Sequence, residues 1–173
     1  MNAPAMTNAS ITYGEYPSVA ERADALGVRR PTGLAMLPRN FATANAGDEL
    51  LAEATDSAVR TIWRQADVEE DRLDSPEAPF PRLSEHHADW IGPTIFVSSA
   101  LISESSALVT VALSVIANYV TDLFKGVPGR HTASLKVVVE RNNGDCVSVA
   151  YKGPATEIGE IMDAVNDITS SDG

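Results

Sequence analysis

The chain has 173 residues, of which 44% are hydrophobic and 21% are charged. This length and apolar fraction predict one globular domain and exclude extensive disorder. The formal net charge is −11, from 13 basic and 24 acidic side chains. A field of this sign repels phosphate groups, so we expect no nucleic-acid partner and no docking on anionic lipid by charge alone.

Cysteine usage and the first residues of the chain indicate a reducing environment. Cys146 is the single cysteine, so no disulfide can form within the chain, and we expect it to be a buried structural thiol. Residues 1–4 show neither the basic nor the apolar region of a signal peptide. We therefore expect a cytoplasmic protein.

The N-terminal half begins with residues 1–12, which are expected to be a flexible end. Ser18 followed by Glu21 matches a capping box, in which the serine oxygen and the glutamate each satisfy a backbone N–H. A short helix then runs to Leu26, and Gly27 suits the left-handed residue that ends a helix.

Two further elements complete this half. Residues 34–37 form an apolar run bounded by glycine and proline, which predicts a short buried strand. Asp56 is a candidate cap for a helix that reaches Gln65. Its apolar side chains recur at helical spacing, and the tryptophan among them is expected in the core. This apolar face comprises Val59, Ile62, Trp63 and Ala66.

The segment 76–90 differs in composition from both of its flanks. It follows an acidic run and is rich in proline, which blocks helices and inner strands. We expect a surface connector between an N-terminal half, 13–75, and a C-terminal half, 91–168, of one domain that spans 13–168. Residues 169–173 are expected to be a flexible tail.

The C-terminal half has the clearest pattern. Residues 94–97 predict a strand or the first turn of a buried helix. The polar run 103–106 is typical of the start of a helix. Residues 107–124 then carry no charge until Asp122, which predicts a strongly apolar helix.

A hairpin is predicted next, with strands over 135–140 and 146–151. Asn143 and Gly144 form the strongest short hairpin signal, because a type I′ turn needs positive φ at both central residues. A closing helix from Thr156 to about Ile168 has an apolar stripe at helical spacing. The stripe comprises Ile158, Ile161, Met162, Val165 and Ile168.

Together these elements predict the fold class. We expect a single compact α/β or α+β domain with a mixed, mostly antiparallel sheet. Its C-terminal part is expected to be a helix–hairpin–helix unit.

The helix over 107–124 carries the main functional hypothesis. Three interpretations remain open: a central core helix, a helix covered by a partner or a second copy, and a helix that inserts into a membrane. Its polar residues recur every four positions, and Asn118 and Asp122 among them would be costly in lipid unless helices assembled around the stripe. The polar residues are Thr110, Ser114, Asn118 and Asp122. Around the helix we expect the anchors of an interface, namely Trp90, Leu108, Val115, Tyr119 and Phe124.

Three arginines form a second candidate interaction site. Arg29, Arg30 and Arg39 lie close together in the sequence and predict a small basic spot. Such a spot can hold a partner's carboxylate through bidentate hydrogen bonds. A solvated surface is the alternative.

The cluster 85–89 is the only polar group with metal-ligand chemistry. It contains Glu85, His86, His87 and Asp89, but adjacent histidines point in different directions and rarely share one ion. A polar surface segment is therefore the alternative to a metal site. The sequence has no nucleophile elbow, no phosphate-cradling glycine loop and no zinc-protease motif. We expect a non-enzymatic protein without a cofactor, and a small metal-dependent enzyme using 85–89 is one alternative.

Residues 91–169 have a recognisable order of elements. An apolar helix rich in small residues precedes a two-stranded hairpin, and Tyr151-Lys152-Gly153-Pro154 leads into a short acidic helix. This order resembles the small effector-associated constant-component modules of bacterial conflict systems, which sit beside caspase-like or trypsin-like proteases and nucleotide-sensing ATPases.

The resemblance implies an accessory or adaptor protein of bacterial antiviral defence. Such a protein acts by protein–protein interaction, with another subunit or a second copy of itself as the partner. No catalytic residue carries over from these modules. A membrane-active effector, held soluble until it is triggered, is the second alternative.

Overall fold

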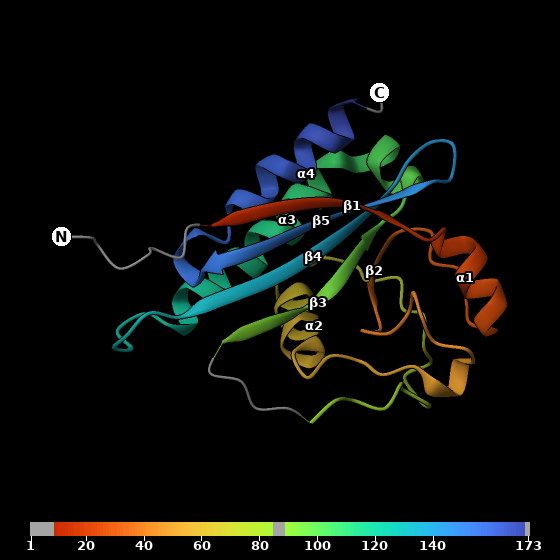
Figure 1. Ribbon diagram of the computed structural model, residues 1–173, viewed down its shortest axis with the longest axis horizontal. Coiled ribbons are helices and arrows are strands. Elements are labelled where there is room, and N and C mark those ends of the chain that lie inside the picture. The colour runs from red at the N-terminus through yellow and green to blue at the C-terminus, as the bar shows by residue number, and fades with distance from the viewer. Residues whose placement is uncertain (1–8, 85–88, 172–173) are drawn as a thin grey trace.

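The computed structural model of the protein describes residues 9–84 and 89–171. In this part of the chain, one α/β domain contains a five-stranded sheet and four α-helices (Figure 1). The strands are β1 (Ser10–Tyr16), β2 (Leu34–Leu37), β3 (Trp90–Val97), β4 (Thr132–Glu140) and β5 (Cys146–Pro154). The α-helices are α1 (Val19–Leu26), α2 (Asp56–Gln65), α3 (Ser99–Leu123) and α4 (Glu160–Ser171), and the 3-10 helices are η1 (Gly47–Glu49) and η2 (Ala155–Glu157).

The sheet has the strand order β1-β5-β4-β3-β2. The neighbours β3 and β4 are parallel and are joined by the crossover helix α3. The other three neighbouring pairs are antiparallel. The sheet is therefore mixed and mostly antiparallel, as predicted, and the two N-terminal strands form its edges.

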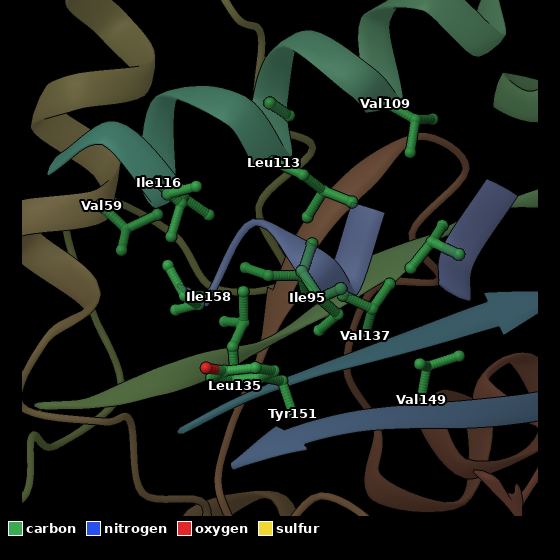
Figure 2. Packing of buried hydrophobic residues seen from close by; sticks show 14 of the residues in the cluster. Val59, Ile95, Val109, Leu113, Ile116, Leu135, Val137, Val149, Tyr151 and Ile158 are labelled. Carbon is green, nitrogen blue, oxygen red and sulfur yellow. The ribbon is translucent and has the colours of Figure 1, made fainter. Parts of the chain in front are cut away.

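The main hydrophobic core lies between one face of the sheet and the helices α2, α3 and α4 (Figure 1). Alternate strand residues point into it, because successive side chains of a strand lie on opposite faces. Figure 2 shows α3 side chains pointing toward this face of the sheet. The residues shown there include Val109, Leu113 and Ile116 of α3 and Ile95, Leu135, Val137, Val149 and Tyr151 of the sheet.

A smaller core covers part of the opposite face. There α1 and the loops that follow β2 pack on Phe96 of β3 and Val138 of β4. The Arg22 side chain ties α1 to one loop, since it donates hydrogen bonds of 2.8 and 2.6 Å to the carbonyl oxygens of Phe41 and Ala44. Within the described residues, no other element covers the rest of this face, toward β1 and the start of β4.

The signals around α1 are confirmed in part. The Ser18 hydroxyl accepts a hydrogen bond of 3.3 Å from the backbone N–H of Glu21, as an N-cap should. Gly27 ends the helix with a φ of 70°, in the left-handed region that glycine adopts without strain. The strand over Leu34–Leu37 forms as predicted, and so does a helix that reaches Gln65, with Trp63 only 1% exposed. Asp56 does not cap this helix: it is the first helical residue, and Thr55 occupies the N-cap position without a side-chain hydrogen bond.

The hairpin forms, but its predicted turn type is wrong. Only Gly144 has a positive φ, of 93°, whereas a type I′ turn would need one at Asn143 as well. The Gly144 N–H donates to the Arg141 carbonyl at 2.9 Å, and the Arg141 N–H donates to the Asp145 carbonyl at 2.8 Å. A type I turn followed by a left-handed glycine fits this longer connection.

The expected flexible ends 1–12 and 169–173 both overlap regular structure. β1 begins at Ser10, which pairs with Lys152, and Ile11 packs against the main core. The strand forms because β5 supplies its backbone hydrogen-bond partners. α4 extends to Ser171, three residues beyond the expected end of the domain.

The two C-terminal helices also begin at other positions than predicted. α3 starts eight residues before position 107, where the Ser98 hydroxyl caps it by accepting from the Leu101 N–H at 3.1 Å. The closing helix was expected from Thr156, but residues 155–157 form η2 and α4 begins at Glu160.

The connector is held by a few backbone hydrogen bonds and apolar contacts. Its described part forms two backbone hydrogen bonds with Ala52: the Ala52 N–H donates to the Pro81 carbonyl at 2.8 Å, and the Leu83 N–H donates to the Ala52 carbonyl at 2.9 Å. Leu73 is buried just before the connector and Phe80 lies against the smaller core. The described part of the connector, 76–84, therefore packs against the rest of the domain.

Candidate functional site

The two sides of α3 differ sharply in burial. Six residues of the inner side are buried in the main core. These are Val109, Ala112, Leu113, Ile116, Ala117 and Val120. The outer side is exposed or half-buried, and Val111 at its centre is 43% exposed. The predicted polar stripe lies on this outer side, with Asn118 and Asp122 exposed.

The first turns of α3 contain a break. Ser105 has φ −159° and ψ 74°, so the helix is kinked where the polar run 103–106 predicted a start. Serine side chains compete for backbone hydrogen bonds, which favours such an interruption. The preceding segment is anchored by the Glu140 carboxylate, which accepts from the Ser99 N–H at 3.0 Å and from its hydroxyl at 3.1 Å.

Beside the kink lies a cavity of about 420 Å³. Among the described residues it is bordered mainly by hydroxyl and amide side chains of α3, α4 and the hairpin turn, and by no charged side chain. Its polar lining includes Ser103, Ser106, Thr110, Asn142, Asn166 and Thr169.

The predicted interface anchors have separate positions. Trp90 is 5% exposed and belongs to the main core, so its side chain cannot serve as a surface anchor. The other four anchors are half-buried and pack against that core: Leu108, Val115, Tyr119 and Phe124. The Phe124 ring also stacks on His131, with ring centroids 4.4 Å apart, beside a cavity of about 370 Å³.

The three arginines of the predicted basic spot all form ion pairs within the chain. Each one already holds a carboxylate of the chain itself, at a different place. Arg29 pairs with Asp71, and Arg30 pairs with Asp24 through a bidentate contact. The Arg39 guanidinium donates to both carboxylate oxygens of Glu53, at 2.7 and 2.8 Å. The guanidiniums are thus used within the fold.

The cluster 85–89 is described only at its last residue. Glu85, His86 and His87 lie outside the described residues. Asp89 accepts a hydrogen bond of 3.3 Å from the Thr132 N–H, and hydrogen bonding to Thr132 holds the pKa of this carboxyl below its usual value. In residues 9–84 and 89–171 no three His, Cys, Asp or Glu side chains are placed to hold a metal ion.

Cys146 is 4% exposed and lies in the smaller core. Burial raises the pKa of its thiol, which lowers the fraction present as the reactive thiolate. Both observations fit the structural thiol that the sequence predicted.

The first residue of α2, Asp56, has a buried carboxyl group. Asp56 is 6% exposed, and its Oδ1 has no hydrogen-bond partner among the residues that the structure describes. Burial raises the pKa of Asp56 to about 7, although Arg60 acts in the opposite direction. Arg60 is itself held by Glu70 through hydrogen bonds of 2.6 and 2.9 Å. Near neutral pH, Asp56 is therefore poised between its charged and neutral forms.

A groove that the sequence did not predict lies on the open part of the sheet. It has a volume of about 300 Å³ and is lined by residues of β3, β4 and β5 and by the Arg39–Glu53 pair. Lys136 and Lys152 are among these residues. Each lysine alternates with apolar residues in its strand, and this alternation was visible in the sequence. Their proximity depends on the β4–β5 register.

Comparison with known proteins assigns no family. No family model, curated protein or solved structure matches the chain. Among the helices of the described residues, α3 alone has the length and apolar composition needed to cross a membrane. Six of its residues are nevertheless buried in the main core.

Proposed function

We propose that the chain is a non-enzymatic interaction protein that packs the outer side of α3 against another protein subunit. One observation carries this proposal. α3 has no charged residue between Glu104 and Asp122, yet only 33% of its most apolar 18-residue window is buried within the chain. Charged residues make up 21% of the chain, and they are mostly found on the surface of proteins. A long exposed helix face without any charged residue is therefore unusual for a surface in contact with water.

The outer side of α3 has the composition of an interface. The cores of protein interfaces are depleted of charged residues. The exposed apolar side chains of α3 are removed from water only when a partner covers them. We call four residues the outer ridge of α3: Ala107, Val111, Ser114 and Asn118. They are spaced by four, three and four residues, the spacing at which one helix packs along another. Their side chains are small or of medium size, which allows the two backbones to approach closely.

The resemblance of residues 91–169 supports a biological setting for this interaction. In this proposal, α3, the β4–β5 hairpin and α4 act as the helix–hairpin–helix unit of an accessory module in a bacterial conflict system. The protein would be a cytoplasmic adaptor of antiviral defence, and Leu108, Val115, Tyr119 and Phe124 would support the ridge from its flanks. The partner is another protein subunit, either a second copy or a component of that system.

The test compares two valines of similar exposure. Val111 on the ridge is 43% exposed, and Val127 in the loop after α3 is 46% exposed. We expect Val111→Asp to convert the protein to a monomer, because it places a charge in the interface, whereas Val127→Asp leaves the assembly intact. Sedimentation velocity of purified protein and size-exclusion of native-host extract report the assembly. The proposal would be refuted if the wild type and both variants were all monomers, or if all three assembled to the same extent.

Membrane insertion is the second candidate, since α3 is long and apolar enough to span a bilayer. Insertion would require the buried side of α3 to leave the main core. Liposome flotation and dye leakage measure it directly. Val111→Asp should abolish membrane binding in that case, while a protein that stays in the aqueous fraction under every trigger excludes this candidate.

A further inference from the structure

The open part of the sheet, on the face opposite α3, presents two lysine side chains together. Lys136 of β4 lies between the core residues Leu135 and Val137, and Lys152 of β5 follows the core residue Tyr151. Because strand side chains alternate between faces, both lysines point away from the helices. Both are exposed.

The strand register brings these lysines close to each other. Lys136 pairs with Ala150, and Ser134 pairs with Lys152, so the lysines occupy diagonal positions on neighbouring strands. Diagonal positions of a sheet are about 7–8 Å apart, within the reach of long side chains. Two flexible ammonium groups can therefore converge on one small anion.

The groove between them has a polar lining suited to an anion. Thr94 pairs with Lys136 across β3 and β4, and the hydroxyls of Thr94 and Ser134 both border the groove. Arg39 contributes one wall, where Glu53 neutralises its charge. The positive potential of the groove therefore comes from the two lysines.

The charge balance of the chain makes this pair unusual. The chain has a net charge of −11 and contains only three lysines. Two of these three lysines line the same groove. In the described residues, neither Lys136 nor Lys152 forms an ion pair with a carboxylate. Asp89 acts on Lys152 only at longer range and already accepts from Thr132. Like charges on neighbouring strands repel, and a bound anion would remove that repulsion.

We propose that this groove binds a small phosphorylated ligand of the phosphate-monoester class. Lys136 and Lys152 neutralise the dianion, and the Thr94 and Ser134 hydroxyls donate hydrogen bonds to its oxygens. The volume of about 300 Å³ fits one small ligand, at the lower end of known ligand sites. The net charge of −11 selects against long polyanions, whose many phosphates the rest of the surface repels.

Binding is measured by calorimetric titration and by NMR amide-shift mapping at low ionic strength, with inorganic phosphate, glycerol phosphate and succinate as probes. We expect both phosphate compounds to shift amides of β4 and β5. Lys136→Gln and Lys152→Gln should each weaken binding at least tenfold, because each removes one charge-assisted contact. Lys125→Gln, beyond the end of α3, is the matched control and should bind as the wild type does.

Three results would overturn the site. Succinate binding as tightly as glycerol phosphate would refute the phosphate class. Absence of shifts in β4 and β5, or equal binding by Lys136→Gln and wild type, would refute the groove. Unchanged urea midpoints of the lysine variants show that they remain folded. Val111→Asp should retain phosphate binding, so this site and the proposed α3 interface succeed or fail separately.

Discussion

The Trp63 indole N–H donates a buried hydrogen bond of 3.1 Å to the backbone carbonyl of Ala112. This bond joins the last turn of α2 to the middle of α3. It fixes the rotation of α3 about its axis, with Ala112 in the core and the adjacent Val111 in solvent. The orientation of the outer ridge of α3 therefore depends on a contact made by the opposite side of the helix.

Replacing each tryptophan by phenylalanine tests this contact. Trp63 and Trp90 are both buried, but the Trp90 Nε1 has no hydrogen-bond partner in the described residues. We expect Trp63→Phe to lower the free energy of unfolding by about 1–2 kcal/mol more than Trp90→Phe does, because only Trp63→Phe loses a hydrogen bond. Urea denaturation of both variants measures the difference. Equal losses would mean that the bond to Ala112 contributes nothing to stability.

Asp56 predicts a specific dependence of stability on pH. Burial raises its pKa in the folded protein to about 7, above the ordinary value of 3.8 expected in the unfolded chain. The folded state therefore binds this proton more tightly than the unfolded state does. The resulting contribution to the free energy of unfolding is fully present below the pKa of the unfolded chain, and it is lost as the pH rises through the pKa of the folded protein.

Asp56→Asn removes that dependence, since its amide cannot ionise. We expect the variant to exceed the wild type in stability at about pH 8 by up to about 4 kcal/mol, because each unit of pKa difference corresponds to about 1.4 kcal/mol. The advantage should shrink as the pH falls toward about 4. Urea unfolding across this range measures it. A difference between variant and wild type that does not change with pH would contradict the assignment.

Gly144 predicts a backbone effect in the hairpin. Its φ of 93° is unfavourable for other residues, and an added Cβ would meet no atom within 4 Å. Gly144→Ala should therefore cost about 1–2 kcal/mol through backbone strain alone. Gly159→Ala is the control, because Gly159 has an ordinary φ and its added Cβ would lie 3.6 Å from Met162. Thermal unfolding compares them, and equal midpoints would argue against strain at Gly144.

Local signals predicted several elements correctly because the relevant contacts lie close together in the sequence. The Ser18 hydroxyl contacts a backbone N–H three residues away, and Gly27 acts through its own φ. The apolar run Leu34–Leu37 is buried on both faces of the sheet, which a continuous apolar pattern indicates. The hairpin was found at Asn143 and Gly144, although its turn contains one positive φ instead of two.

Long-range pairing explains what the sequence did not predict. β1 pairs with β5 from the opposite end of the chain, and its mostly exposed residues have no clear alternation. Arg29 forms an ion pair with Asp71, which lies 42 residues away in the sequence. The charge of this arginine is therefore paired by a residue that a short sequence window does not contain. The groove between Lys136 and Lys152 exists only through the register of β4 and β5. None of these contacts has a signature within a short window of sequence.

Cysteine labelling at the outer ridge tests the central claim most directly. Val111→Cys and Val127→Cys place thiols at positions of similar exposure, while the native Cys146 is buried and serves as the unreactive internal reference. Rates of alkylation are compared between native-host extract and dilute purified protein. A partner on α3 predicts that position 111 reacts much more slowly than position 127 in the extract, and equally fast once the protein is purified and dilute. Equal rates at the two positions in the extract would contradict an interface on α3.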